Sequence, residues 1–166
     1  MKAVIGLGFG DEGKGVTTDW LASTEDISAV ARFSGGHQAG HNVVVGDTQH
    51  VFSNFGAGTL RGLPTYWEET CTIDPVGMKC EYDLLVSKGY SPELQIHKNC
   101  PITTTLEKFA NHLSVDTMKH GTCGVGFFET LKREKAMFSL TAGDIEHNTI
   151  FDMKLNSIAN NYYGYD

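Results

Sequence analysis

Residues 6–15 have the sequence GLGFGDEGKG, and this stretch predicts how the chain folds. An apolar run at 2–6 precedes it and ends at a glycine, which is typical of a buried strand. A helical pattern at 16–22 follows, with Trp20 and Leu21 expected on its inner side. A glycine-rich loop between a strand and a helix directs several backbone amides and the positive helix end at one point. Phosphate is the natural ligand of such a loop.

Two phosphate-binding patterns fit this loop. Gly8, Gly10 and Gly13 match GxGxxG, the dinucleotide pattern. Gly8, Gly13 and Lys14 match the GxxxxGK of triphosphate-binding loops, with Gly15 in place of the usual Ser or Thr. A dinucleotide site also needs an acid roughly 20 residues later, at the end of the second strand, and the chain has none there. The triphosphate pattern is therefore favoured.

The charged residues inside the loop also indicate a function. Without the Ser or Thr hydroxyl, a magnesium ion bound with the phosphates needs another protein ligand, and Asp11 is the candidate. A purely structural turn needs one or two glycines. It gains nothing from Asp11, Glu12 and Lys14 packed between them.

Outward from the loop, strand-like and helix-like segments alternate. Asp74-Pro75 is a good helix opening and Gly89 a natural stop. The alternation predicts an α/β fold: a mainly parallel sheet with flanking helices and an antiparallel hairpin, in one nucleotide-binding domain over 1–166. Strands are expected at 27–33, 69–73 and 94–97, a hairpin at 41–45 and 49–53, and helices at 75–88, 105–115 and 127–136.

Composition excludes several classes of protein. Hydrophobic residues make up 40% and charged residues 20% of the 166 residues, which excludes a wholly disordered chain. The formal net charge of −7 argues against a nucleic-acid polymer as partner. No apolar stretch approaches the roughly 18 residues of a membrane span. The four cysteines form no CxxC pair, so we expect reduced thiols in a cytoplasmic protein.

Two segments, 6–15 and ARFSGGHQAGH at 31–41, resemble the adenylosuccinate synthetase family in order, spacing and strand–loop context. That family has a GDEGKG loop followed by R-[FY]-x-GG-x-x-AGH. Looser collinear similarity continues in GTLR at 58–61, GTCG at 121–124 and GDI at 143–145. The resemblance therefore spans most of the chain.

The resemblance implies a GTP-dependent ligase that joins L-aspartate to a 6-oxopurine nucleotide, converting IMP to adenylosuccinate in purine nucleotide biosynthesis. GTP phosphorylates the 6-oxygen, and the amino group of aspartate then displaces the phosphate. On this resemblance Asp11 is the base that removes the N1 proton and is also a Mg²⁺ ligand. His41 is the acid that shares a proton with the moving phosphoryl oxygens, and the Gly40 carbonyl is a further Mg²⁺ ligand.

The resemblance also implies binding residues and a homodimer with a partly shared site. Arg133 would serve the substrate phosphate of the partner subunit, with a solvated charge cluster as the alternative. Arg32 is either a family residue or a structural ion pair, and His37 is expected to be structural. GTP or phosphate contacts fall on Gly10, Glu12, Gly13, Lys14 and Gly15. Acceptor-nucleotide contacts fall on Asp11, Gln38, Ala39, Thr122, Cys123 and Arg133.

The sequence departs from the family pattern on one side of the site. Gln38, Cys123 and Val125 stand where the family has Asn, Thr and Arg, all on the side that holds the purine monophosphate. The acceptor therefore stays open between IMP and dGMP. A bacteriophage branch of the family uses dGMP to make 2-aminoadenylosuccinate for diaminopurine DNA.

Length leaves further alternatives open. Family chains are much longer, and the segments that recognise guanine and aspartate are not found in these 166 residues. The chain is expected to be part of a longer protein or a shortened, non-catalytic nucleotide-binding module. The GxGxxG match keeps a nicotinamide-dependent oxidoreductase as a third hypothesis.

Overall fold

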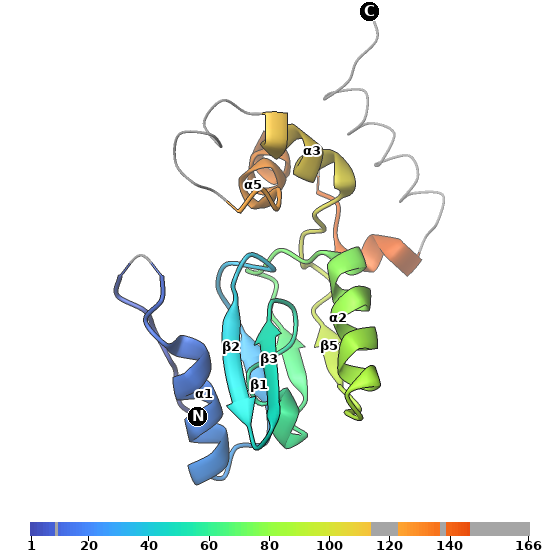
Figure 1. The fold of residues 1–166 in the computed structure, drawn as a ribbon. Helices are drawn as coiled ribbons and strands as arrows, with labels where there is room; N and C mark the ends of the chain where they lie inside the picture. Colours follow the sequence, from blue (N-terminus) through green and yellow to red (C-terminus); the bar gives the residue numbers. More distant parts are fainter. Residues whose placement is uncertain (9, 114–122, 137–138, 147–166) are drawn as a thin grey trace, which may run out of the picture.

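The computed structural model describes residues 1–8, 10–113, 123–136 and 139–146, which form two small sheets with helices around them (Figure 1). A three-stranded parallel sheet has the order β1-β4-β5, from Val30–Arg32, Thr65–Trp67 and Leu94–Ile96. An antiparallel hairpin pairs β2, His41–Val45, with β3, Thr48–Phe52. The predicted α/β class, with a parallel sheet and an antiparallel hairpin, is confirmed.

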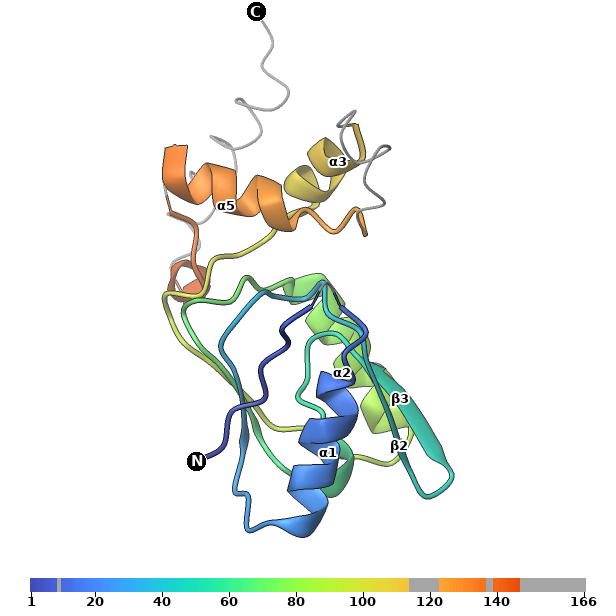
Figure 2. The ribbon, with the colours of Figure 1, turned by 90° about the vertical axis from the view of Figure 1, so that its left-hand side faces the viewer.

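Helices lie beside and above these sheets. Helix α1 and helix α2 lie on opposite sides of the strands, and α3 and α5 lie together above the carboxyl ends of β1, β4 and β5 (Figures 1 and 2). Their bounds are Lys14–Thr24 for α1, Pro75–Ser87 for α2, Thr105–Leu113 for α3 and Phe127–Ala136 for α5. Short 3₁₀ turns η1 and η2 cover Thr59–Arg61 and Ala142–Glu146.

Several helix predictions are confirmed closely. Helix α5 has the predicted bounds, and α2 begins at Pro75 after Asp74. Gly89, in the left-handed region at φ 88°, follows its end. Asp74 does not cap the helix with its side chain; its carboxylate instead pairs with Lys108 of α3 at 2.5 Å. This ion pair ties α2 to α3.

Three predictions are wrong. The run 2–6 forms no strand, and Ile5 and Leu7 are 68% and 97% exposed, because none of the described strands pairs with it. Trp20 is on the outer face of α1, since the inner face carries Gly15 and Asp19.

In 69–73 only isolated bridges form, and the strand of this region is β4, a three-residue element after Pro64. An element of that length is too short to leave a periodic signal in the sequence.

Buried polar contacts join the hairpin end to the core. The Glu81 carboxylate of α2 accepts hydrogen bonds from the backbone amides of Ser53, Asn54 and Phe55. From the other side, the Arg32 guanidinium donates to the carbonyl of Ser53 and lies 4.6 Å from the centre of the Trp67 ring. Arg32 is therefore a structural residue, held by carbonyls and an aromatic ring.

Among the described helices, none has both the length and the hydrophobicity that crossing a bilayer requires.

Candidate functional site

The loop before α1 depends on left-handed backbone. Gly10 has φ 118°, Gly13 has φ 73°, and Asp11, at φ 55°, is the sole non-glycine residue with positive φ in the described part of the chain. Glycine adopts such angles without steric cost, and Asp tolerates them better than most side chains. The sequence GDEG thus folds into a turn that exposes the Asp11 carboxylate at the tip.

Glu12 and Lys14 close the loop on itself. Glu12 Oε1 accepts the backbone N–H of Gly8 at 2.7 Å, and Oε2 pairs with the Lys14 ammonium. The hydrogen bond from Lys14, followed by that from Gly8, lowers the pKa of the Glu12 carboxyl. The Lys14 side chain is 36% exposed, so its ammonium group is accessible to an incoming phosphate.

His41 lies against the first turn of α1, as the first residue of β2. A Cβ built on Gly15 would lie 2.5 Å from the Cβ of His41, so the helix start and the histidine are in direct contact. The Ser or Thr of the triphosphate pattern has no room here. The absence of that hydroxyl from the sequence therefore follows from the close approach of His41.

The electrostatics around His41 favour an anion. Burial, followed by the positive charges of Arg32 and Lys14, lowers the pKa of the His41 imidazole to about 4. The ring is thus neutral at pH 7, among cations that would attract phosphate. A bound phosphate would offset those positive charges and make the ring a better proton carrier.

Gly15→Ser is expected to destabilise the protein by about 1–3 kcal/mol, because the added side chain overlaps His41. Urea unfolding of wild type and variant measures the change. Val16→Ser is the matched control, since Val16 is on the exposed face one position later. An equal effect of both substitutions would show that the contact between Gly15 and His41 is unimportant.

Titration of His41 provides a second test. The ordinary pKa is 6.5 and the folded value about 4, so the unfolded chain binds more protons between those pH values. His41 therefore leaves the free energy of unfolding unchanged above pH 6.5 and lowers it as the pH falls from 6.5 toward 4. NMR of the ring C–H groups should give a midpoint near 4, and His41→Asn should weaken the loss of stability between pH 7 and 5. A midpoint near 6.5 would contradict this environment.

The two segments expected to bind the acceptor nucleotide lie side by side. Gln38 is exposed, Ala39 is half-buried, and Cys123 is exposed at the start of the segment before α5. The His37 ring joins the segments, with Nε2 3.0 Å from the Val125 carbonyl oxygen. Thr122 lies outside the described residues. The structure therefore brings the sequence-predicted segments 38–40 and 123 together through His37, for which the sequence predicts a structural role.

Arg133 is not part of this arrangement. Its side chain is 0% exposed, and its Nε donates to Glu107 of α3 at 2.6 Å. The same guanidinium contacts Glu134 and the Ile102 carbonyl. The alternative of a solvated cluster is therefore wrong for Arg133, and its predicted contact with a substrate phosphate has no support in this geometry.

The residues assigned to Mg²⁺ have suitable chemistry. Mg²⁺ binds through one or two carboxylates together with substrate phosphates and water. Within the described residues no hydrogen bond or ion pair engages the exposed Asp11 carboxylate, and the Gly40 backbone is exposed as well. No cluster of three or more His, Cys, Asp or Glu side chains in the described part could hold a metal ion alone. The donor set therefore suits a metal that arrives with phosphate.

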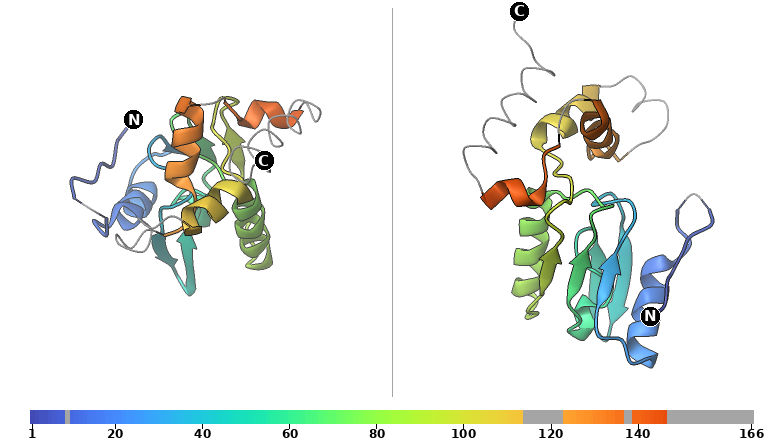
Figure 3. Two further views of the ribbon diagram at one scale, coloured as in Figure 1. Left: turned by 90° about the horizontal axis from the view of Figure 1, so that it is seen from above. Right: turned by 180° about the vertical axis from the view of Figure 1, so that it is seen from behind.

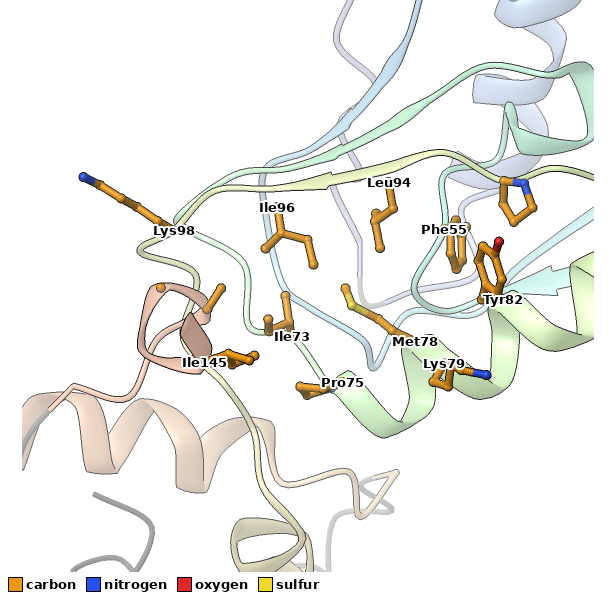
Figure 4. A pocket seen from close by; sticks show the side chains of 13 residues that line it. Phe55, Ile73, Pro75, Met78, Lys79, Tyr82, Leu94, Ile96, Lys98 and Ile145 are labelled. Atoms are coloured by element: carbon orange, nitrogen blue, oxygen red, sulfur yellow. The ribbon is translucent and has the colours of Figure 1, made fainter. Parts of the chain in front are cut away.

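Two hollows lie near the core, and sequence analysis predicted neither. One, of about 680 Å³, is lined mainly by apolar side chains of α2, β5 and η2, including Met78, Leu94 and Ile145 (Figure 4). The other, of about 380 Å³, is lined by His37 and Val125 among others. Of the described residues that are predicted to bind or react with substrate, none lines either hollow. Residues from distant parts of the chain form both, so no local sequence signal marks them.

Comparison with known proteins gives a consistent result. The family model for adenylosuccinate synthetase matches residues 3–164. Adenylosuccinate synthetase of Acidithiobacillus ferrooxidans is 32% identical over 158 residues, covering 92% of this chain and 36% of the relative. That of Methylibium petroleiphilum is 30% identical over 169 residues, covering 93% and 36%. The chain thus spans about a third of the length of these relatives.

Two solved structures share the fold. Fully ligated adenylosuccinate synthetase of Plasmodium falciparum superposes with a TM-score of 0.76 at 19% identity, over 95% of this chain and 39% of that one. Succinoaminodeoxyadenylate synthetase of cyanophage S-2L, bound to dGMP and to dATP as an energy donor, has a TM-score of 0.59 at 19% identity. That match covers 89% of this chain and 45% of the phage protein.

Proposed function

The chain belongs to the adenylosuccinate synthetase family, and from that premise we propose that it is part of a GTP-dependent ligase that joins L-aspartate to a 6-oxopurine nucleotide. The observation that carries the proposal is the contact between Gly15 and His41. It sets an imidazole at the start of the helix that follows the phosphate loop. Catalysis by a positioned proton carrier needs this kind of proximity.

Each group in the loop then has a defined task. Lys14 and the amides of Gly13 and Gly15 bind the phosphates of GTP, with Gly10 and Glu12 shaping the loop around them. Asp11 takes the N1 proton of the acceptor purine, which makes the 6-oxygen nucleophilic. His41 shares a proton with the transferred phosphoryl oxygens. Mg²⁺, held by Asp11 and the Gly40 carbonyl, would neutralise phosphate charge when bound.

The acceptor nucleotide contacts the segments joined by His37. Gln38 and Ala39 lie on one segment, and Cys123 lies on the other, with Thr122 next to it in the sequence. We propose IMP as the acceptor, with dGMP as the second candidate. The likeness in fold to the cyanophage protein and the departures at Gln38, Cys123 and Val125 favour testing dGMP on equal terms.

The wider setting is part of the same proposal. The enzyme acts in the cytoplasm on small molecules, as a homodimer whose subunits complete each other's site. It binds neither membrane nor nucleic-acid polymer. Residues 1–166 form one nucleotide-binding domain of a longer protein.

The test combines two acceptors with two phosphoryl donors. The intact protein is incubated with Mg²⁺, L-aspartate, IMP or dGMP, and GTP or dATP, and succinylated nucleotide and nucleoside diphosphate are measured. Product from IMP with GTP supports the first candidate, and product from dGMP supports the second. Nucleotide binding without product from any pair would contradict the ligase and favour a non-catalytic module.

A further inference from the structure

His37 makes a long-range contact that the proposed chemistry does not use. The residue is 6% exposed, and its Nε2 lies 3.0 Å from the carbonyl oxygen of Val125, 88 residues away in sequence. A carbonyl oxygen accepts hydrogen bonds and cannot donate them, so Nε2 carries the proton and donates it. Nδ1 is buried and has no hydrogen-bond partner among the described residues. The His37 ring therefore makes this hydrogen bond through Nε2.

The contact joins two parts of the molecule. His37 is in the loop that connects β1 to β2, and Val125 is in the segment that leads into α5. The same two parts also pack nearby, because a Cβ on Gly36 would lie 3.4 Å from Phe127 Cδ2. Helices α3 and α5 lie beside each other above the strands when the molecule is seen from behind (Figure 3). On its far side, the Val125 segment is held by α3, where Asn111 Oδ1 accepts the Gly126 N–H at 3.3 Å. The position of the segment is thus set by α3 on one side and by His37 on the other.

One exposed residue lies within two positions of each partner of this hydrogen bond. Gln38 follows the buried His37 and faces solvent, and Cys123 precedes Val125 and is exposed too. The hydrogen bond thus ties together two segments that each carry an exposed side chain, Gln38 on one and Cys123 on the other. Lys14 begins α1, and His41 packs against the first turn of that helix.

We propose that His37 is a positioning residue for the acceptor nucleotide, acting through the Val125 carbonyl to hold the segments of Gln38 and Cys123 at a fixed separation. This inference rests on the proposed function and adds a specificity role to it. Loss of the bond should weaken binding of the purine monophosphate and leave GTP binding at the phosphate loop unchanged. The proposal therefore predicts that KM for the acceptor nucleotide rises while KM for GTP does not change. General destabilisation would not produce this difference.

Three substitutions at His37 distinguish the role of Nε2 from that of Nδ1. The amide nitrogen of Gln reaches the position of His Nε2, so His37→Gln keeps the donor to Val125. Asn is shorter and places its amide nitrogen near Nδ1, so His37→Asn removes the donor while staying polar. His37→Leu removes both nitrogens. His97→Leu is the control, since His97 has 43% of its side chain exposed, between β5 and α3.

For His37→Asn and His37→Leu we expect KM for the acceptor nucleotide to rise about tenfold, with KM for GTP unchanged within twofold. His37→Gln should restore acceptor KM to within about threefold of wild type, and His97→Leu should have no effect. Equal acceptor KM values for wild type and His37→Asn would overturn the proposal. So would a parallel rise of both KM values.

A second measurement needs no turnover. Amide hydrogen exchange at Gly124, Val125 and Gly126 should be faster in His37→Asn than in wild type and His37→Gln. Unchanged exchange would show that the bond does not hold the segment, which overturns the inference even if the enzyme is active. If exchange changes as expected but wild type binds neither IMP nor dGMP, the proposed function fails and the positioning role for that ligand fails with it.

Discussion

Asp11→Asn is expected to slow formation of the succinylated nucleotide by about 10²–10⁴-fold, the usual effect of removing a proton carrier. Asn is nearly the same size as Asp, and it tolerates the left-handed backbone of position 11, where φ is 55°. The substitution therefore removes the carboxylate and keeps the loop. Initial rates with saturating GTP, aspartate and acceptor nucleotide measure the effect.

The control for this experiment is Asp47→Asn in the turn between β2 and β3, where the side chain is exposed. Its rate should equal that of wild type. Urea unfolding of Asp11→Asn should also match wild type, because the Asp11 side chain makes no hydrogen bond or ion pair with the described residues. An Asp11→Asn protein that keeps more than a tenth of the wild-type rate would exclude Asp11 as the base.

Arg133→Met is expected to lower the free energy of unfolding by about 3–5 kcal/mol. The substitution leaves the Glu107 carboxylate without its 2.6 Å ion pair, although that side chain is 0% exposed. A buried charge that loses its partner is strongly destabilising, whereas an apolar pair of similar volume is often tolerated. The double variant Arg133→Met/Glu107→Leu should therefore recover much of the loss. Urea unfolding of the single and double variants measures both effects.

An exposed ion pair is the control for Arg133. Lys79 and Asp83 form one along α2, with 71% and 57% of their side chains exposed, and Lys79→Met should leave unfolding unchanged. If Arg133→Met lowered the free energy of unfolding by less than about 1 kcal/mol, a structural role for the buried ion pair would be contradicted. A normal unfolding curve with a raised KM for the acceptor nucleotide would instead restore Arg133 as a substrate residue.

The parts of the fold that the sequence predicted well have strong local signals. The hairpin follows from alternating residues around Gly46-Asp47, and α5 has the predicted bounds. Helix α2 follows from Pro75 and Gly89, which restrict the backbone wherever they occur. Such signals act within a few residues, so they survive without knowledge of tertiary contacts.

The failed predictions concern residues whose environment is set by distant partners. The run 2–6 has the composition of a strand, but a strand also requires a neighbour to accept its hydrogen bonds. The outer position of Trp20 follows from the packing of Gly15 on His41 and from the pair between Asp19 and Arg61, 42 residues later. No periodic pattern within α1 records those partners.

The candidate site divides in the same way. The sequence predicts a phosphate-binding loop and shows two segments that resemble a known family, because glycine spacing and charged residues in a short loop are local signals. Four features follow from tertiary packing instead: Gly15 must be glycine, His41 is neutral, Arg133 is buried and His37 joins two segments. Gly15 and His41 are 26 residues apart, as are Glu107 and Arg133, and His37 and Val125 are 88 apart. Close packing and burial, rather than local propensity, bring such residues together and lower the pKa of His41.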